Sequence, residues 1–194
     1  EPAKALDTCL GCHSKDMARA NIRRSEHTQN DVACTSCHSI HHSLVPKFLL
    51  AKKQTELCYT CHQPVRAQFS MPFKHRVNEG VVQCSDCHNP HGSAGPKQLV
   101  KNTVNETCFQ CHAEKRGPFL WEHAPVANSC VTCHDPHADN RPKDPVAYYR
   151  KKCLDCHQTK PCSEPEPKRR ANEPADNCSA CHMPRGDTDI PHIA

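Results

Sequence analysis

Eight copies of one five-residue unit, Cys-x-x-Cys-His, carry most of the chemistry that this 194-residue sequence offers, and they use all but one of its 17 cysteines. Two thiols at this spacing can add to the vinyl groups of a haem, and the adjacent imidazole can ligate its iron. The unit therefore predicts eight covalently bound haem c groups, each with one proximal histidine. The units are Cys9/Cys12/His13, Cys34/Cys37/His38, Cys58/Cys61/His62, Cys84/Cys87/His88, Cys108/Cys111/His112, Cys130/Cys133/His134, Cys153/Cys156/His157 and Cys178/Cys181/His182.

Three other kinds of cysteine site compete with haem attachment. Zinc ribbons also carry Cys-x-x-Cys pairs, separated by about 15–20 residues, and the interval from Cys111 to Cys130 is close to that range. A disulfide framework would account for the cysteines equally well, whereas a thioredoxin-type redox motif would occur once. None of the three requires a histidine directly after every second cysteine, so the sequence favours haem.

The histidines outside the motifs are candidates for the second axial ligand of each iron. The chain has 16 histidines, so eight remain once each motif has taken one, and the three methionines are too few to serve generally. Eight spare histidines for eight irons favour bis-histidine ligation. Three stand between the motifs of a pair (His27, His75, His123), three follow a second motif by three residues (His41, His91, His137), and two are irregular (His42, His192).

The histidines that closely follow a motif must serve a different haem from the one their own motif holds. Three residues span at most roughly 10 Å, too little to carry the backbone around a porphyrin rim. His41, His91 and His137 should therefore tie neighbouring haems together. The last repeat differs, because Arg185 replaces the corresponding histidine and none lies between His157 and Cys178. His42 and His192 are candidates for the positions left open, with Met183, water or a histidine of another subunit as alternatives.

The motifs also define the organisation of the chain. They pair into an internal repeat of about 45–50 residues, which predicts a single octahaem domain, 1–194, built of four two-haem repeats at about 1–50, 51–100, 101–145 and 146–194. Short helices are expected around Gln54–His62 and Pro145–His157, with loops elsewhere, including the proline-rich segment 163–174. No alternating strand pattern is present. The expected fold is mostly irregular with short α-helices: an elongated multihaem cytochrome c.

Composition shows why haem would have to form the core. Aromatic residues make up 5% of the chain, and the 36% counted as hydrophobic includes all 17 cysteines. The ordinary apolar side chains are too few for a protein core of the usual kind, so eight porphyrins would supply it. Their propionates would take the formal charge from +4 to about −12. The Lys and Arg residues are therefore expected at the solvated surface or beside propionates, and nucleic acid is not an expected partner.

The sequence also bears on location. Haem c is attached outside the cytoplasm, which predicts an exported protein of the periplasm, the outer membrane or the cell exterior. The chain starts directly in polar sequence, as expected of a mature form whose signal peptide has been removed. No stretch approaches the 18 apolar residues of a transmembrane helix. Cys162, outside every motif, is expected to be buried or incidental, with an intermolecular link or a haem contact as the alternative.

Three segments carry a resemblance to a known family: CSDCHNPHG from Cys84, ETCFQCHAEKRGPFLWEHAP from Glu106 and CVTCHDPHA from Cys130. They resemble the periplasmic multihaem cytochromes of the outer-membrane conduit type. That family includes decahaem proteins that sit within porin barrels and the related pentahaem donor to nitrite reductase. The resemblance implies a bis-histidine wire that passes electrons between periplasmic redox proteins and outer-surface multihaem cytochromes, with an outer-membrane porin as a further partner. The eight motifs and the divergent last repeat depart from that pattern.

Three functions remain open on the sequence. The first is electron transfer in anaerobic respiration, by hopping along eight bis-histidine haems between periplasmic donors and outer-membrane or extracellular acceptors. The second is a subunit of an extracellular cytochrome filament that assembles with itself. The third, a multihaem reductase, needs an iron with an open coordination position. The supply of spare histidines and the lack of a Cys-x-x-Cys-Lys variant argue against an enzyme.

Overall fold

The computed structural model describes residues 2–118, 122–138, 145–159, 162–171 and 177–183. The chain divides into two compact units, Glu1–Ala138 and Asp139–Ala194, and each is described here by itself. The first unit contains six of the eight motifs and the second contains two.

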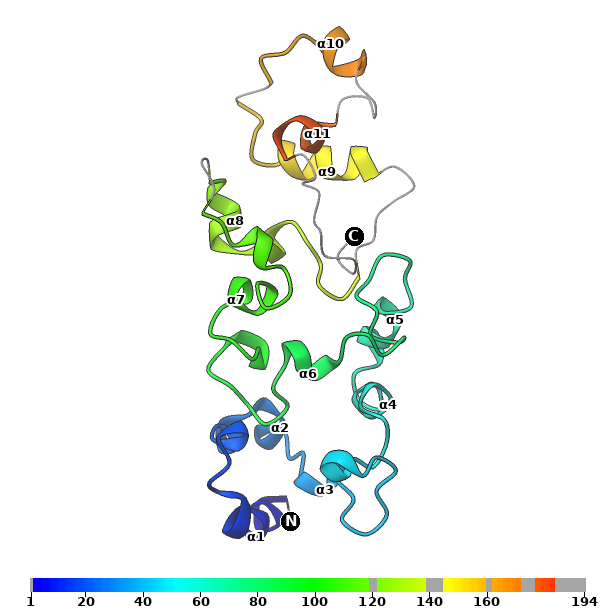
Figure 1. Ribbon diagram of the computed structural model, residues 1–194, viewed down its shortest axis with the longest axis vertical. Helices are drawn as coiled ribbons and strands as arrows, with labels where there is room; N and C mark the ends of the chain where they lie inside the picture. The colour runs from blue at the N-terminus through cyan, green and yellow to red at the C-terminus, as the bar shows by residue number, and fades with distance from the viewer. Residues whose placement is uncertain (1, 119–121, 139–144, 160–161, 172–176, 184–194) are drawn as a thin grey trace. The chain divides into compact units, whose positions relative to one another are not determined.

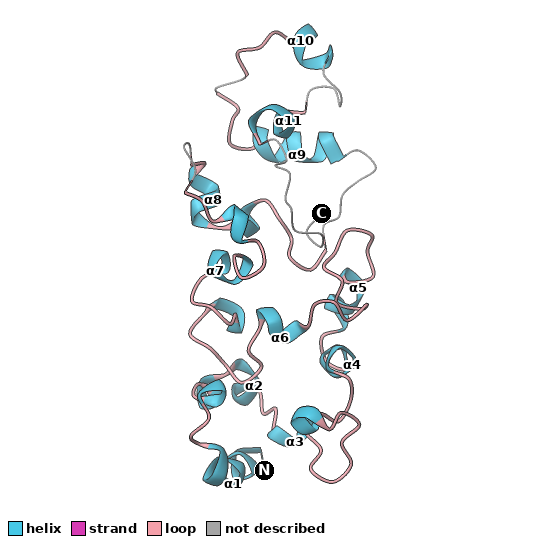
Figure 2. Ribbon diagram, in the orientation of Figure 1, coloured by secondary structure: helices cyan, strands magenta, loops and turns pink. Residues whose placement is uncertain are grey.

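Short helices joined by long loops make up the first unit (Figure 1). Isolated bridges such as His38 with Leu50 and His88 with Leu99 occur, but no strand forms within the described residues (Figure 2). The expectation of a mostly irregular chain with short α-helices is confirmed. The α-helices are α1 Pro2–His13, α2 Glu26–Gln29, α3 Cys34–Cys37, α4 Gln54–Tyr59, α5 Gln63–Gln68, α6 Cys84–Cys87, α7 Val104–Cys108 and α8 Ala124–Asn128, and the 3-10 turns are η1 Met17–Arg19, η2 Ile22–Arg24, η3 Lys47–Leu49, η4 Pro96–Gln98, η5 Ala113–Lys115 and η6 Cys130–Thr132.

Side-chain caps fix where several of these helices begin. The Ser25 hydroxyl accepts a hydrogen bond from the Thr28 amide at the start of α2, and the Thr103 hydroxyl accepts one from the Glu106 amide at the start of α7. Such caps satisfy amide groups that the first helical turn leaves without partners. The helix expected from Gln54 does begin there, but it ends at Tyr59, three residues earlier than the sequence suggested.

The second unit contains α9 Pro145–Leu154, α10 Glu166–Ala171 and α11 Cys178–His182, and α9 packs against α11. The helix expected from Pro145 begins at that residue and ends at Leu154. Helix α10, however, lies in the segment expected to be loop, so that expectation was wrong there. Ion pairs one turn apart stabilise it, Lys168 with Glu164 at 2.6 Å and Arg170 with Glu166 at 2.7 Å.

Little of the described chain is buried in a protein core. The main cluster consists of Tyr59, Phe69 and Val77, which are 3–7% exposed. By contrast, Leu44 and Phe48 are 77% and 70% exposed. This distribution fits a polypeptide that leaves apolar surface for another apolar body instead of packing it against itself. None of the helices in the described part of the chain combines the length and the apolar character that a bilayer crossing requires.

Candidate functional site

In the first compact unit, each of the last five Cys-x-x-Cys-His motifs is folded as one helical turn. In each, the histidine amide donates to the carbonyl of the first cysteine four residues earlier, at 2.8–3.1 Å; the donors are His38, His62, His88, His112 and His134. Residues at positions i, i+3 and i+4 lie on the same face of such a turn. The two thiols and the imidazole of a motif therefore project from a single face, as attachment to one flat ligand requires.

Four pairs of histidine rings lie close together in the first unit, and each pair joins a motif histidine to a spare one. The ring centroids are 6.0–6.2 Å apart in all four pairs, and the two rings of the tightest pair are inclined by only 14°. The pairs are His62 with His27, His38 with His91, His112 with His75, and His88 with His137.

This separation is the one that an iron between two imidazoles needs. A metal–imidazole bond of about 2 Å on each side, plus about 1.1 Å from each nitrogen to its ring centre, places the two centroids about 6 Å apart. Aromatic rings that pair directly also lie about 4.5–7 Å apart between centroids. What favours ligation is that all four pairs have nearly the same separation and each joins a motif histidine to a spare one. The residues present therefore fit bis-histidine haem ligation at these four positions.

The pairs follow one rule along the predicted repeats. A histidine between two motifs, such as His27, lies beside the first motif histidine of the next repeat, His62. A histidine three residues after a second motif, such as His91, lies beside the second motif histidine of the preceding repeat, His38. Each of these four sites thus takes its two imidazoles from consecutive repeats, which ties the repeats together.

Backbone carbonyls orient four of the paired rings. Nδ1 of His38 donates to the Phe48 carbonyl at 2.7 Å, and Nδ1 of His88 donates to the Lys97 carbonyl at 2.9 Å. A proton held on Nδ1 leaves Nε2 free to bind a metal and fixes the plane of the ring. These bonds therefore select the tautomer that iron ligation requires.

The same arrangement holds two of the spare histidines. Nδ1 of His27 lies 2.9 Å from the Pro90 carbonyl, and Nδ1 of His75 lies 2.7 Å from the Pro136 carbonyl. The sequence analysis assigned these prolines no role in ligation, and so missed that their carbonyls orient candidate ligands. The available signal was that both prolines stand two residues after a second motif, in His-x-Pro-His.

Unusual backbone geometry aims the carbonyls at the motif histidines. Phe48 and Leu49 have φ values of 67° and 53°, and Lys97 and Gln98 have 51° and 57°. Each such left-handed residue other than glycine costs on the order of 1–3 kcal/mol. The same two-residue bend occurs in both repeats, beside the same ring nitrogen, so the backbone strain coincides with the orientation of a predicted ligand.

The turn that carries His91 docks onto the preceding repeat. The Asn89 amide group donates to the Ala18 carbonyl at 3.1 Å, and Gly92 is buried with a φ of 93°. A Cβ atom on Gly92 would lie 2.8 Å from the Asn21 carbonyl oxygen and 2.9 Å from Ser25 Cβ. Burial, and then the neighbouring His38 ring, lowers the pKa of His91, which favours the neutral imidazole that binds metals.

Contacts between thiols show which motifs are neighbours in space. Within a repeat the first cysteines of the two motifs share a hydrogen bond: Cys9 with Cys34, Cys58 with Cys84, and Cys108 with Cys130. Between repeats, second cysteines also lie close together. Burial and then the Cys61 thiol raise the pKa of Cys37, and burial, then Asp86, then the Cys111 thiol raise the pKa of Cys87. The hydrogen bond from Cys58 lowers the pKa of Cys84 to about 7 in the chain without haem. The six attachment sites of the first unit therefore adjoin in sequence order.

The second cysteines of the other four motifs take no part in these thiol contacts. Cys12, Cys156 and Cys181 are exposed, and Cys133 is half-buried. None of these four thiols is among the contacts between motifs described above. Their predicted role in haem attachment rests on the Cys-x-x-Cys-His spacing alone, and it stays a prediction.

Other candidate ligands are likewise not brought together with a partner. His41 and His42 are exposed, and neither ring faces another histidine within the described residues. His13 has Arg19 at its Nδ1, 3.3 Å away. His192 and Arg185 lie outside the described residues. Cys162 is exposed.

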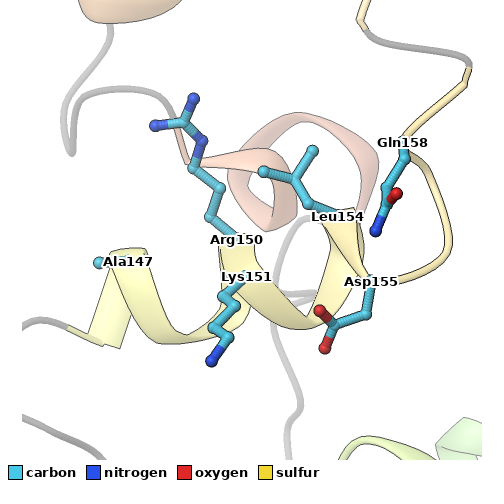
Figure 3. Close-up of a pocket in the computed structure, with 6 residues that line it drawn as sticks. All are labelled: Ala147, Arg150, Lys151, Leu154, Asp155 and Gln158. Carbon is cyan, nitrogen blue, oxygen red and sulfur yellow. The ribbon is translucent and has the colours of Figure 1, made fainter.

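In the second unit, a pocket of about 310 Å³ lies along α9 beside the seventh motif (Figure 3). Its lining includes two cations, Arg150 and Lys151, together with Leu154 and Asp155. Cations in this position suit the propionate groups of a haem held by Cys153 and the residues that follow it.

The alternatives to haem find no counterpart in the part of the chain that the structure describes. There, no group of three or more His, Cys, Asp or Glu side chains converges as on a bare metal ion. All 17 cysteines are described, and each is a free thiol.

Comparisons with known proteins agree with these observations. The doubled CXXCH motif family model matches residues 27–67, 75–117 and 123–162, and the cytochrome c554 and c-prime family model matches residues 1–39. The chain is 42% identical over 126 residues to the multiheme cytochrome MtrA of Shewanella baltica, an alignment that covers 65% of this chain. The chain spans 37% of the length of that curated relative.

Proposed function

Because this chain belongs to the multihaem cytochromes with doubled CXXCH motifs and binds haem c, we propose that it is an electron carrier with eight haems, most of them ligated by two histidines. The observation that carries this proposal is the set of four histidine pairs at 6.0–6.2 Å. The family matches span six motifs, and the sequence holds two more, at Cys9 and Cys178.

The roles of the chain follow from the geometry. When bound, the haems supply one-electron iron couples, and His/His ligation favours lower potentials than His/Met. The cysteines hold each group at a fixed place, and the thiol contacts make consecutive places adjoin. The Nδ1 hydrogen bonds of the histidines hold the imidazole planes. An electron carrier needs this fixed order and close spacing of its centres, and it needs no open substrate position.

We further propose that the protein acts outside the cytoplasm, between periplasmic donors and outer-membrane or extracellular acceptors, and that a porin is among its partners. The similarity to the multiheme cytochrome MtrA supports this location, as does the family resemblance of the segments at Cys84, Glu106 and Cys130. In this proposal each motif histidine is one axial ligand of a haem. His27, His75, His91 and His137 supply the second ligand at four sites, and the candidates for the remaining positions are His41, His42, His123 and His192.

Two measurements test the haem content. The intact mass of the purified holoprotein should exceed that of the polypeptide by eight haems, and electron paramagnetic resonance should show low-spin ferric iron for at least the four paired sites. A mass increase of fewer haems would refute the count. High-spin iron in most sites would refute bis-histidine ligation.

A third experiment tests the cellular role. The purified holoprotein is mixed with an outer-membrane porin of the conduit type in liposomes that enclose an oxidised dye, and a reductant is added outside. We expect dye reduction only when both proteins are present. Dye reduction that depends on neither protein, together with no complex between them, would contradict the conduit role. Long filaments in negative-stain images would also contradict it and would favour the filament.

A further inference from the structure

One axial histidine faces a carboxylate where four others face a neutral carbonyl. Nδ1 of His112 lies 3.8 Å from Oε1 of Glu114. The four carbonyl-anchored rings have their acceptors at 2.7–2.9 Å. His112 itself belongs to a histidine pair, because its ring centre lies 6.2 Å from that of His75. A charged acceptor thus lies beside one site of the predicted haem chain.

The carboxylate of Glu114 is shielded from water and has little to compensate it. Its side chain is 23% exposed, and both carboxylate oxygens are buried without a hydrogen-bond partner. The nearest cation, Lys115, lies 3.9 Å from Oε1 and is itself 60% exposed, so water screens it. Burying a carboxylate without a donor is costly. The Nδ1–H group of His112 is a donor in the right place, and a shift of about 1 Å would bring the two within hydrogen-bond distance.

We propose that Glu114 is a positioning residue for this site: its carboxylate accepts a hydrogen bond from the Nδ1–H group of His112 and lowers the reduction potential of the haem that His112 and His75 would ligate. The inference rests on the proposed function, since it requires a haem at this pair. A hydrogen bond to a carboxylate raises the basicity of a ligating imidazole. A nearby negative charge also stabilises ferric over ferrous iron, which carries one positive charge less. Both effects act in the same direction.

Neighbouring sites differ from this one in the sequence as well as in the structure. The position of Glu114 relative to its motif histidine is held by Pro64 after His62, and a proline side chain can accept no proton. The adjacent site at His88 has its Nδ1 bonded to the Lys97 carbonyl, a neutral acceptor. The haem at His112 should therefore have a lower potential than its neighbours of otherwise similar ligation.

The test compares two isosteric substitutions in the holoprotein. Glu114→Gln keeps an oxygen acceptor and removes the charge, while Glu106→Gln removes a charge from the exposed side of the same repeat, on α7. A spectroelectrochemical titration follows each variant. For Glu114→Gln we expect one couple to move upward, with the equilibrium constant for electron exchange with its neighbours changing about tenfold, or about 59 mV for a one-electron couple. For Glu106→Gln we expect a much smaller change.

The outcomes separate this inference from the proposed function. Every variant is first checked for its haem number by intact mass and for low-spin iron by electron paramagnetic resonance. A wild-type protein without low-spin haem at this pair would overturn the proposed function. Full haem content with identical titration curves for wild type and Glu114→Gln would overturn the role of Glu114 alone. If Glu114→Gln loses haem, Glu114→Asp is measured in its place, because it keeps the charge on a shorter side chain. A reduction potential that stays at the wild-type value supports the electrostatic role. An upward shift as large as the tenfold change refutes it.

Discussion

Replacing Gly92 by alanine should destabilise the protein more than the same replacement at Gly80, because only Gly92 lies in the contact between two repeats. Both glycines have positive φ, 93° and 76°, and an alanine in this region costs on the order of 1–2 kcal/mol. At Gly80 nothing lies within 4 Å of the added Cβ, whereas at Gly92 the Cβ meets the Asn21 carbonyl oxygen at 2.8 Å. Relieving that overlap costs a further 1–3 kcal/mol or so, since Ser25 beside it is only 2% exposed.

Guanidinium unfolding of the holoproteins, followed by far-ultraviolet circular dichroism, measures the two changes in the free energy of unfolding. Electron paramagnetic resonance of the folded variants adds a second readout, because Gly92 directly follows His91 and its displacement should move that ring away from His38. We expect high-spin iron at one site in Gly92→Ala and none in Gly80→Ala. Equal destabilisation by the two replacements, with unchanged low-spin iron in both, would refute the docking of consecutive repeats at this turn.

Three further predictions follow from the ligand geometry and the buried hydrogen bonds. His91→Ala should convert about one eighth of the iron to the high-spin state, because one of the eight proposed haems would lose one axial ligand, while Asn102→Ala, at an exposed position, should leave the resonance spectrum unchanged; equal effects would contradict the pairing. Asn105→Ala should cost about 2–4 kcal/mol in guanidinium unfolding, because the buried amide makes hydrogen bonds to two carbonyls of α8 and to one backbone amide. The exposed control Asn102→Ala should cost close to nothing, and a similar cost for both would show that the bonds contribute little. Cys162→Ser should leave the haem number in the intact mass unchanged, since this exposed thiol belongs to no motif; a loss of one haem would assign it a role in attachment.

The chemistry of each attachment site could be predicted from sequence because it is local. The cysteines and histidine of a motif stand at positions i, i+3 and i+4, and one helical turn brings these to a common face without help from the rest of the chain. The composition also showed the shortage of apolar residues, and the small buried cluster of Tyr59, Phe69 and Val77 agrees with it. The motif pairs alone do not fix where each repeat begins. The family matches begin at His27, His75 and His123 and span the repeat boundaries that the motif pairs gave.

The partners of four spare histidines, His27, His75, His91 and His137, were decided only by the tertiary structure. Sequence spacing shows that His91 cannot reach its own motif's iron, but that it lies beside His38 depends on how one loop docks onto the preceding repeat through Gly92. The anchoring of His27 by the Pro90 carbonyl depends on the same docking, across 63 residues of chain. Glu114 gave no signal in the sequence, because a charged side chain between Ala113 and Lys115 looks like any residue of a solvated surface. The predicted covalent attachment depends on residues that are neighbours in the chain, whereas the proposed axial ligation and the proposed role of Glu114 depend on neighbours in space, which only packing brings together.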